Sequence, residues 1–186
     1  MSFIETIPPE RAQGFLSELY DTIAGARGGV ADVLAVQSLN PEALEAHFDL
    51  YATLMFGRSE LDRRTREMIG VLVSARNGCP YCVNHHTEPL RRFEVDEELL
   101  EALGRGEIPE GLSPPVHELL AFARDLNDDP VADEARVDDL RDIGWSDRAI
   151  LDATMLCGYF NFVNRVALGL GVALEENFER TTGEPT

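Results

Sequence analysis

The fold is decided by residues 59–87, SELDRRTREMIGVLVSARNGCPYCVNHHT, which join an amphipathic segment to a cysteine pair. Apolar residues recur in the first part at intervals of three and four, which predicts a helix with one buried face. Ser59 is its expected N-cap, and Gly78 is expected to end it because glycine readily adopts the left-handed conformation. Pro80 suits the first turn of a second helix, where its missing N–H needs no partner. The stretch therefore predicts two helices joined by a tight turn.

The second helix opens on two thiols, which makes its first turns the candidate working site. Cys79 lies near the expected N-cap, Cys82 falls in the first turn, and His85 and His86 follow about one turn later. Helical residues three apart have side chains about 5–6 Å apart, close to what a disulfide requires. A helix N-terminus stabilises a thiolate by roughly 0.3–1 kcal/mol, less than one pKa unit. A larger pKa shift needs a donor such as charged His86, or a base.

Three interpretations of the CxxC pair remain open from spacing alone. The thiols could form a redox dithiol, or they could pack in the core without chemistry. They could also bind zinc, with Cys79, Cys82 and a histidine as ligands and Glu67 or the second histidine as the fourth. Cys157 stands alone in an apolar segment, so we expect it to pack in the core.

Other ionisable residues carry no separate functional signal. Glu67 falls outside the apolar stripe of its helix and has Arg63 and Arg64 one turn back, so periodicity alone predicts a solvated ion-pair residue. His47 and His117 have no comparable context.

Composition excludes several classes of function. The 186 residues carry 16 Lys and Arg against 34 Asp and Glu, a net charge of −18 that repels nucleic acid and anionic membranes. We see no secretory signal and no apolar run of the ~20 residues that a membrane-spanning helix needs. Three cysteines do not make a secreted disulfide framework. We therefore expect a cytoplasmic protein with one domain, residues 1–186.

The remaining patterns predict helices and no confident strand, so we expect an all-α multi-helix bundle. A helix is expected from Pro9 to about Ala24, followed by a flexible connection over Gly25–Gly29. The last long helix, capped by Ser146, is apolar on nearly every face and belongs in the centre of the domain or in a subunit interface. Asn161, Asn164 and Arg165 are its polar exceptions. Further helices are predicted over 33–39, 41–56 (capped by Asn40), 96–104, 115–127 and 137–143.

One spacing pattern resembles a known family. Glu67, Cys79, Cys82 and His86 stand in the order E–x11–CxxC–xxxH, which resembles the signature of AhpD-like alkylhydroperoxidases in the carboxymuconolactone decarboxylase superfamily. The surrounding sequence is similar to the peroxidase-related branch of this superfamily. The similar segments are the IPPE start, CPYCVNHH and GWSDRAILDATMLCGYFNFVNR. The resemblance covers roughly residues 7–172.

The resemblance implies an all-α AhpD-like fold, a homo-oligomer (dimer, trimer or hexamer) and thiol-dependent reduction of peroxide without a metal or cofactor. Cys82 would attack the peroxide and Cys79 would resolve the product, with Glu67 and His86 as proton relay. Helix-end electrostatics alone would instead favour Cys79 as the thiol of lower pKa. An unidentified dithiol would restore the pair.

Two positions depart from the family pattern. Tyr81 stands where the best-studied relatives carry a histidine, so we expect a shorter relay with Tyr81 and His85 as accessory residues. Pro89 should bend or end its helix and shift the histidines. The alternatives are a disulfide reductase or electron carrier that uses the same thiols, and a zinc-stabilised, non-enzymatic binding module. Lactone decarboxylase activity is disfavoured, because the superfamily's lactone decarboxylases lack the CxxC.

Overall fold

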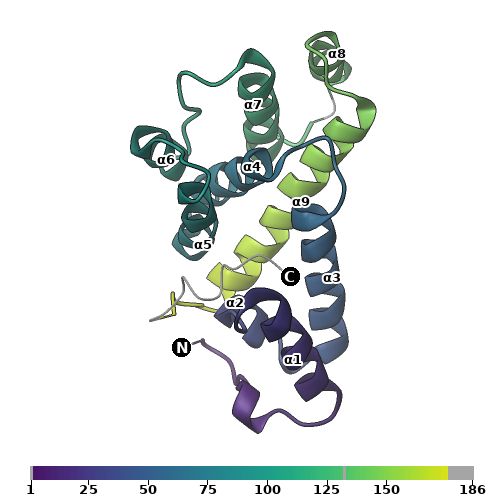
Figure 1. Ribbon diagram of the computed structural model, residues 1–186, viewed down its shortest axis with the longest axis vertical. Helices are drawn as coiled ribbons and strands as arrows, with labels where there is room; N and C mark the ends of the chain where they lie inside the picture. The colour runs from purple at the N-terminus through teal and green to yellow at the C-terminus, as the bar shows by residue number, and fades with distance from the viewer. Residues whose placement is uncertain (1, 132, 176–186) are drawn as a thin grey trace.

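Every regular element of residues 2–131 and 133–175, which the computed structural model describes, is a helix (Figure 1). This confirms the predicted all-α class. A short 3-10 helix at Pro9–Arg11 precedes nine α-helices within these residues. The α-helices are α1 (Phe15–Arg27), α2 (Asp32–Ala35), α3 (Pro41–Phe56), α4 (Arg63–Arg76), α5 (Pro80–Arg91), α6 (Glu97–Gly104), α7 (Pro114–Asp128), α8 (Glu134–Asp142) and α9 (Asp147–Gly169).

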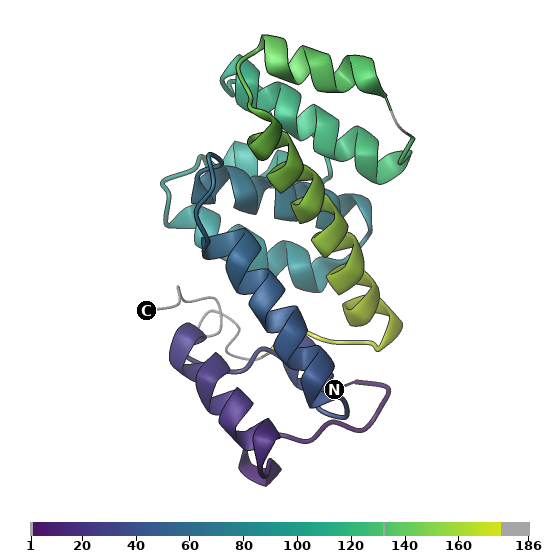
Figure 2. The same cartoon turned by 90° about the vertical axis from the view of Figure 1, so that its right-hand side faces the viewer.

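Helix α4 is the central element of the fold. It packs against α3, α5, α6, α7 and α9, and residues 65–74 are all buried. Helix α9 runs diagonally in both views from the α7–α8 end of the molecule to the α1–α2 end (Figures 1 and 2). The cysteine-bearing α5 makes its most extensive contacts with α4. The first of the two helices predicted from residues 59–87 therefore forms the middle of the protein, and the second packs against it.

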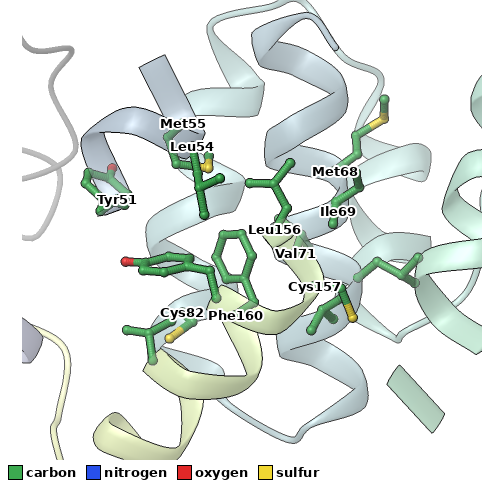
Figure 3. Packing of buried hydrophobic residues seen from close by; sticks show 14 of the residues in the cluster. Tyr51, Leu54, Met55, Met68, Ile69, Val71, Cys82, Leu156, Cys157 and Phe160 are labelled. Carbon is green, nitrogen blue, oxygen red and sulfur yellow. The ribbon is translucent and has the colours of Figure 1, made fainter. Parts of the chain in front are cut away.

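A glycine lets α9 approach α4 closely. A Cβ on Gly70 would overlap the ring of Phe160, which is fully buried. Figure 3 shows this ring within the buried cluster, among side chains of α3, α4 and α9. Because Gly70 has no side chain, the Phe160 ring can pack directly against α4.

The predicted cap at Ser59 is wrong. Asp62 is the N-cap of α4, and its Oδ1 accepts a hydrogen bond of 2.7 Å from the Thr65 N–H. The Ser59 hydroxyl instead donates to Asp152 Oδ2 at 2.6 Å and so ties the segment before α4 to α9. Both aspartate and serine can cap a helix, so the local sequence did not discriminate between them. The caps predicted elsewhere, at Asn40 and Ser146, are confirmed.

The N-terminal predictions also need correction. The first α-helix begins at Phe15 and not at Pro9, and it continues through the predicted flexible connection to Arg27. Gly28 ends it with a φ of 80°. The extra turn carries the side chain of Arg27 into the core, where it is 7% exposed. The next helix is shorter than expected and covers Asp32–Ala35.

Helix α9 is buried on one side and exposes apolar side chains on the other. Four large apolar residues of this helix are 40–52% exposed: Leu151, Met155, Phe162 and Leu168. None of the helices in the described part of the chain is both long enough and apolar enough to cross a membrane.

Candidate active site

The turn between α4 and α5 places both thiols of the CxxC motif at a helix N-terminus. Gly78 adopts a φ of 66°, and the Cys79 N–H donates to the Ser74 carbonyl at 2.9 Å, which closes the turn. Cys79 is the N-cap of α5, Pro80 is its first residue and Cys82 lies in its first turn, as predicted. Both cysteines are reduced, with exposed fractions of 1% and 2%. The local sequence thus builds a buried dithiol.

The two thiols share hydrogen bonds that make them unequal. The Cys82 S–H donates to the Cys79 sulfur, and this bond, against the opposing effect of burial and with help from the backbone N–H groups of Tyr81 and Cys82, lowers the pKa of Cys79 to about 7. The same hydrogen bond, together with burial and the neighbouring charge, raises the pKa of Cys82 well above its ordinary value. Of the two thiols, Cys79 therefore has the lower pKa, and the main cause is its hydrogen bond with Cys82.

A buried carboxylate and an imidazole lie beside this pair. Glu67 Oε2 accepts a hydrogen bond of 2.6 Å from His86 Nδ1, and Glu67 Oε1 accepts one of 2.7 Å from Arg63 Nε. Burial favours the neutral acid, but the charges and hydrogen bonds of His86 and Arg63 outweigh it, so the pKa of Glu67 lies below its ordinary value. Glu67 is fully shielded from solvent. The prediction of a solvated residue is wrong, because α4 is buried on all sides.

His86 is held in place by aromatic packing as well as by Glu67. Its ring meets the Phe160 ring edge to face, with centroids 4.7 Å apart and an interplanar angle of 87°. Phe160 itself occupies the space left by Gly70. Helix α5 includes Pro89 and continues to Arg91, so the proline does not displace His86 from Glu67.

A second carboxylate lies on the other side of α5. Glu175 accepts hydrogen bonds from Tyr81 Oη at 2.6 Å, from His85 Nε2 at 2.8 Å and from the Asp32 N–H at 2.6 Å. Against burial, these partners lower the pKa of Glu175 to about 2. The rings of Tyr81 and His85 stack with centroids 4.4 Å apart. Sequence reasoning missed Glu175, because it follows the last helix and belongs to no periodic pattern.

A small cavity of about 30 Å³ lies between these two groups. Its wall includes Cys82 and His86 but not Cys79, so Cys82 is the sulfur that faces the cavity. Arg27 also lines it, with its guanidinium 4.7 Å from the centroid of the Tyr51 ring. The remaining lining residues are Ala31, Val33, Leu34, Tyr51, Tyr81, His85, Tyr159 and Val163.

Cys157, His47 and His117 lie outside this site. Cys157 is buried, and burial raises its pKa to about 11, in line with the predicted core role. His47 is buried with Nε2 2.9 Å from Tyr159 Oη, whereas His117 is exposed beside Glu118. Among the residues with described positions, no group of three or more His, Cys, Asp or Glu side chains is arranged to hold a metal ion.

The amino-acid sequence is similar to a known protein family and to a curated protein. A family model described as "Carboxymuconolactone decarboxylase family" matches residues 41–125. The chain is 29% identical over 133 residues to "Alkyl hydroperoxide reductase AhpD" of Rhodococcus erythropolis, which covers 66% of this chain and 72% of that protein.

Two solved structures share the fold over nearly the whole chain. A peroxidase-related protein from Ralstonia eutropha superposes with a TM-score of 0.86 at 24% identity, over 100% of this chain and 98% of that one. A peroxidase-related protein from a Silicibacter species gives a TM-score of 0.79 at 29% identity, over 97% and 92%. The helical fold with its buried CxxC pair is thus of the AhpD type. In sequence over residues 41–125 and in fold over nearly the whole chain, the protein is similar to the AhpD-like carboxymuconolactone decarboxylase superfamily.

Proposed function

We propose that the protein is a thiol peroxidase that reduces hydrogen peroxide or a small organic hydroperoxide through Cys79 and Cys82. The observation that carries this proposal is that one cavity is lined by Cys82 of the thiol pair and by His86 of the buried Glu67–His86 pair. The similarity to a protein named alkyl hydroperoxide reductase supports it.

The proposed cycle has three balanced steps. A thiolate attacks one peroxide oxygen, the O–O bond breaks, and the departing RO⁻ takes a proton and leaves as ROH, so that the sulfur becomes a sulfenic acid. The second thiol attacks that sulfur, loses its proton and releases water as the disulfide forms. An external dithiol then reduces the disulfide by thiol–disulfide exchange and is itself oxidised. The sum is ROOH plus dithiol giving ROH, water and an oxidised dithiol.

Cys82 is the proposed attacking sulfur because it faces the cavity, whereas Cys79 does not line it. The charge rests on Cys79 before reaction, and the Cys82 S–H points at that charge. Transfer of this proton to Cys79 makes Cys82 the thiolate at the moment of attack. Cys79 then holds the proton until it attacks the sulfenic acid, so the same sulfur serves first as base and then as resolving thiol.

His86 is the proposed proton donor to the departing oxygen. It lines the cavity, and its Nδ1 is bound to Glu67, so Nε2 is the nitrogen that can pass a proton to substrate. Glu67 fixes the ring and stabilises its positive charge. Tyr81 and His85 line the cavity as accessory groups, and Glu175 holds both of them through hydrogen bonds.

The structure also bears on the substrate, the reductant and the oligomeric state. A cavity of about 30 Å³ accommodates hydrogen peroxide or the peroxy end of a small molecule. The buried disulfide would be restored by a dithiol of the reducing cytoplasm. The exposed apolar side of α9 supports a homo-oligomer in which a second copy covers it.

The proposal is tested by adding one equivalent of peroxide to the reduced protein. We expect the loss of two thiols, a Cys79–Cys82 disulfide by mass spectrometry, and a sulfenic acid on Cys82 in the Cys79→Ser variant. Catalytic reduction of peroxide in the presence of an added dithiol should likewise depend on Cys79 and Cys82. A protein that reduces disulfides but ignores peroxide would instead be a disulfide reductase, and stoichiometric zinc in metal-free buffer would favour a zinc-stabilised binding module. Either result would contradict the peroxidase.

A further inference from the structure

Tyr159 lies in the wall of the cavity beside Cys82, and its hydroxyl is the only polar group of its side chain. The residue is 6% exposed and lines the cavity together with Cys82 and His86. A buried tyrosine hydroxyl usually has a hydrogen-bond partner, and here the partner is His47, whose Nε2 lies 2.9 Å from Tyr159 Oη. Neither Tyr159 nor His47 has a role in the cycle described above.

His47 is a neutral imidazole in this environment. It is 4% exposed, and burial, together with the charge of Arg27, lowers its pKa to about 4. Near neutral pH one ring nitrogen therefore carries a hydrogen and donates, while the other accepts. The position of that hydrogen decides whether the Tyr159 hydroxyl accepts a hydrogen bond from His47 or donates one to it.

Gln37 fixes the position of the hydrogen on His47. Gln37 Nε2 donates to the Val33 carbonyl at 2.7 Å, and because a carbonyl oxygen only accepts, this contact sets the orientation of the amide. The same Nε2 lies 2.8 Å from His47 Nδ1, closer than Gln37 Oε1 at 3.1 Å. An NH₂ group has a second hydrogen to donate, so Nδ1 is the accepting nitrogen. The hydrogen of His47 is therefore on Nε2.

The Tyr159 hydroxyl consequently accepts from His47 and keeps its own hydrogen for another acceptor. Within residues 2–131 and 133–175 this hydroxyl makes no other hydrogen bond. Because Tyr159 lines the cavity with Cys82 and His86, its O–H is available to a substrate there. Burial raises the pKa of Tyr159 well above its ordinary value, so the phenol offers this hydrogen in a hydrogen bond and does not give it up.

We propose that Tyr159 is a further catalytic residue that donates a hydrogen bond to the departing oxygen of the peroxide, with His47 and Gln37 as its positioning residues. This inference rests on the proposed function and adds a second donor to it. His86 still supplies the proton that the departing RO⁻ takes. Tyr159 stabilises the charge that develops on this oxygen and transfers no proton, so the balance of the cycle is unchanged. A donor that is already fixed in a buried cavity needs no reorganisation during the reaction.

The test is the rate at which the reduced protein consumes one equivalent of peroxide. Tyr159→Phe removes the hydroxyl and keeps the ring in the core. We expect the rate to fall about 10- to 100-fold, as is usual when a hydrogen bond to a charged oxygen is lost. Alkylation of Cys79 by iodoacetamide and reduction of the disulfide by a dithiol should not change, because neither reaction involves a peroxide oxygen.

The matched control is Tyr20→Phe. Tyr20 is also buried, but its hydroxyl donates to the Ile7 carbonyl at 2.9 Å and the residue does not line the cavity. This variant should lose thermal stability and keep the wild-type rate with peroxide. A folded Tyr159→Phe variant that reacts at the wild-type rate, or an equal loss in Tyr20→Phe, would overturn the proposal. If Tyr159→Phe does not fold, as judged by circular dichroism, His47→Leu decides, because it leaves the phenol without its positioning donor and should also slow the reaction.

A second measurement tests the positioning without peroxide. The nitrogen chemical shifts of His47 in ¹⁵N-labelled protein report which ring nitrogen carries the hydrogen, and we expect Nε2. A hydrogen on Nδ1 would mean that the Tyr159 O–H is donated to His47, which would overturn the proposal. The absence of any reaction of the wild type with peroxide would overturn the proposed function and this role with it, whereas a reactive wild type with an unaffected Tyr159→Phe variant would overturn this role alone.

Discussion

The Glu67 carboxylate lies 2.6 Å from His86 Nδ1, on helices that are joined by a three-residue turn, and no solvent reaches it. Arg63 completes the group by donating to the other carboxylate oxygen, with its guanidinium over the Phe56 ring. A buried carboxylate that stays ionised fixes the tautomer of a neighbouring imidazole and stabilises its charged form. The first prediction follows from this contact between Glu67 and His86.

Glu67→Gln should lower peroxide turnover by about 100-fold, the usual range for loss of a general acid–base partner. The amide keeps the shape of the side chain but cannot stabilise a protonated His86. We expect the loss in kcat, with the thiol titration little changed. Glu88→Gln, a half-buried carboxylate on α5 that pairs with Arg91, is the control. Full activity in the Glu67 variant would remove the relay from the mechanism.

The pH dependence of the thiols follows from their shared hydrogen bond. Because the pKa of Cys79 is about 7, alkylation by iodoacetamide should accelerate as the pH rises through 7 and level off above it. Cys82→Ala removes the S–H donor and should return the pKa of Cys79 toward its ordinary value, whereas Cys82→Ser keeps a donor and should raise it less. Cys157, with a pKa of about 11, should not react in this range. Equal titration of the Ala and Ser variants would show that the shared hydrogen bond does not control reactivity.

The turn that holds these thiols could be predicted from the sequence because its signals are local. Gly78 supplies the left-handed conformation, Pro80 starts a helix, and Cys79 between them occupies the N-cap position. The pairing of Glu67 with His86 was predicted only from the family resemblance. The structure places the two side chains in hydrogen-bond contact. Their chemical roles remain predictions.

The rest of the site could not be predicted because it depends on packing between distant segments. Periodicity placed Glu67 on a solvated face, but that inference assumes a helix with one exposed side, and α4 has none over residues 65–74. Glu175 reaches His85 across 90 residues of sequence, and no pattern in the chain encodes such a contact. Arg27 enters the cavity only because its helix runs one turn further than Gly25 suggested.

Glu175→Gln should destabilise the fold in a pH-dependent way, because Glu175 holds Tyr81 and His85 of the cavity wall. The pKa of Glu175 is lowered to about 2 in the folded protein, so the stability it contributes is fully present above the unfolded pKa near 4.5 and is lost as the pH falls through 2. The difference in melting temperature between wild type and variant should therefore be constant at neutral pH and shrink below about 4.5. Glu107→Gln, an exposed carboxylate beside Arg105, should show no such trend. A difference that persists unchanged in acid would contradict the ionised contact.

The exposed side of α9 should be an assembly surface. Phe162→Glu places a charge where an apolar side chain is 47% exposed, and we expect it to shift an oligomer toward the monomer in light scattering. Leu39→Glu changes a residue that is 56% exposed outside this helix, so it should leave the mass unchanged. A monomeric wild type, or equal effects of both variants, would exclude α9 as the interface.

Gly70→Ala tests the close packing that holds His86. The added Cβ would overlap the Phe160 ring, which must shift, and overpacking of this kind costs about 1–3 kcal/mol of the free energy of unfolding. Because Phe160 also contacts His86 edge to face, we expect reduced peroxide turnover in the folded variant as well. Gly104→Ala is the matched control, since a Cβ there meets no atom within 4 Å and alanine favours the helix that glycine weakens. Chemical denaturation of both variants measures the difference. If they unfold at the same denaturant concentration, the ring is free to move and cannot be what fixes the imidazole.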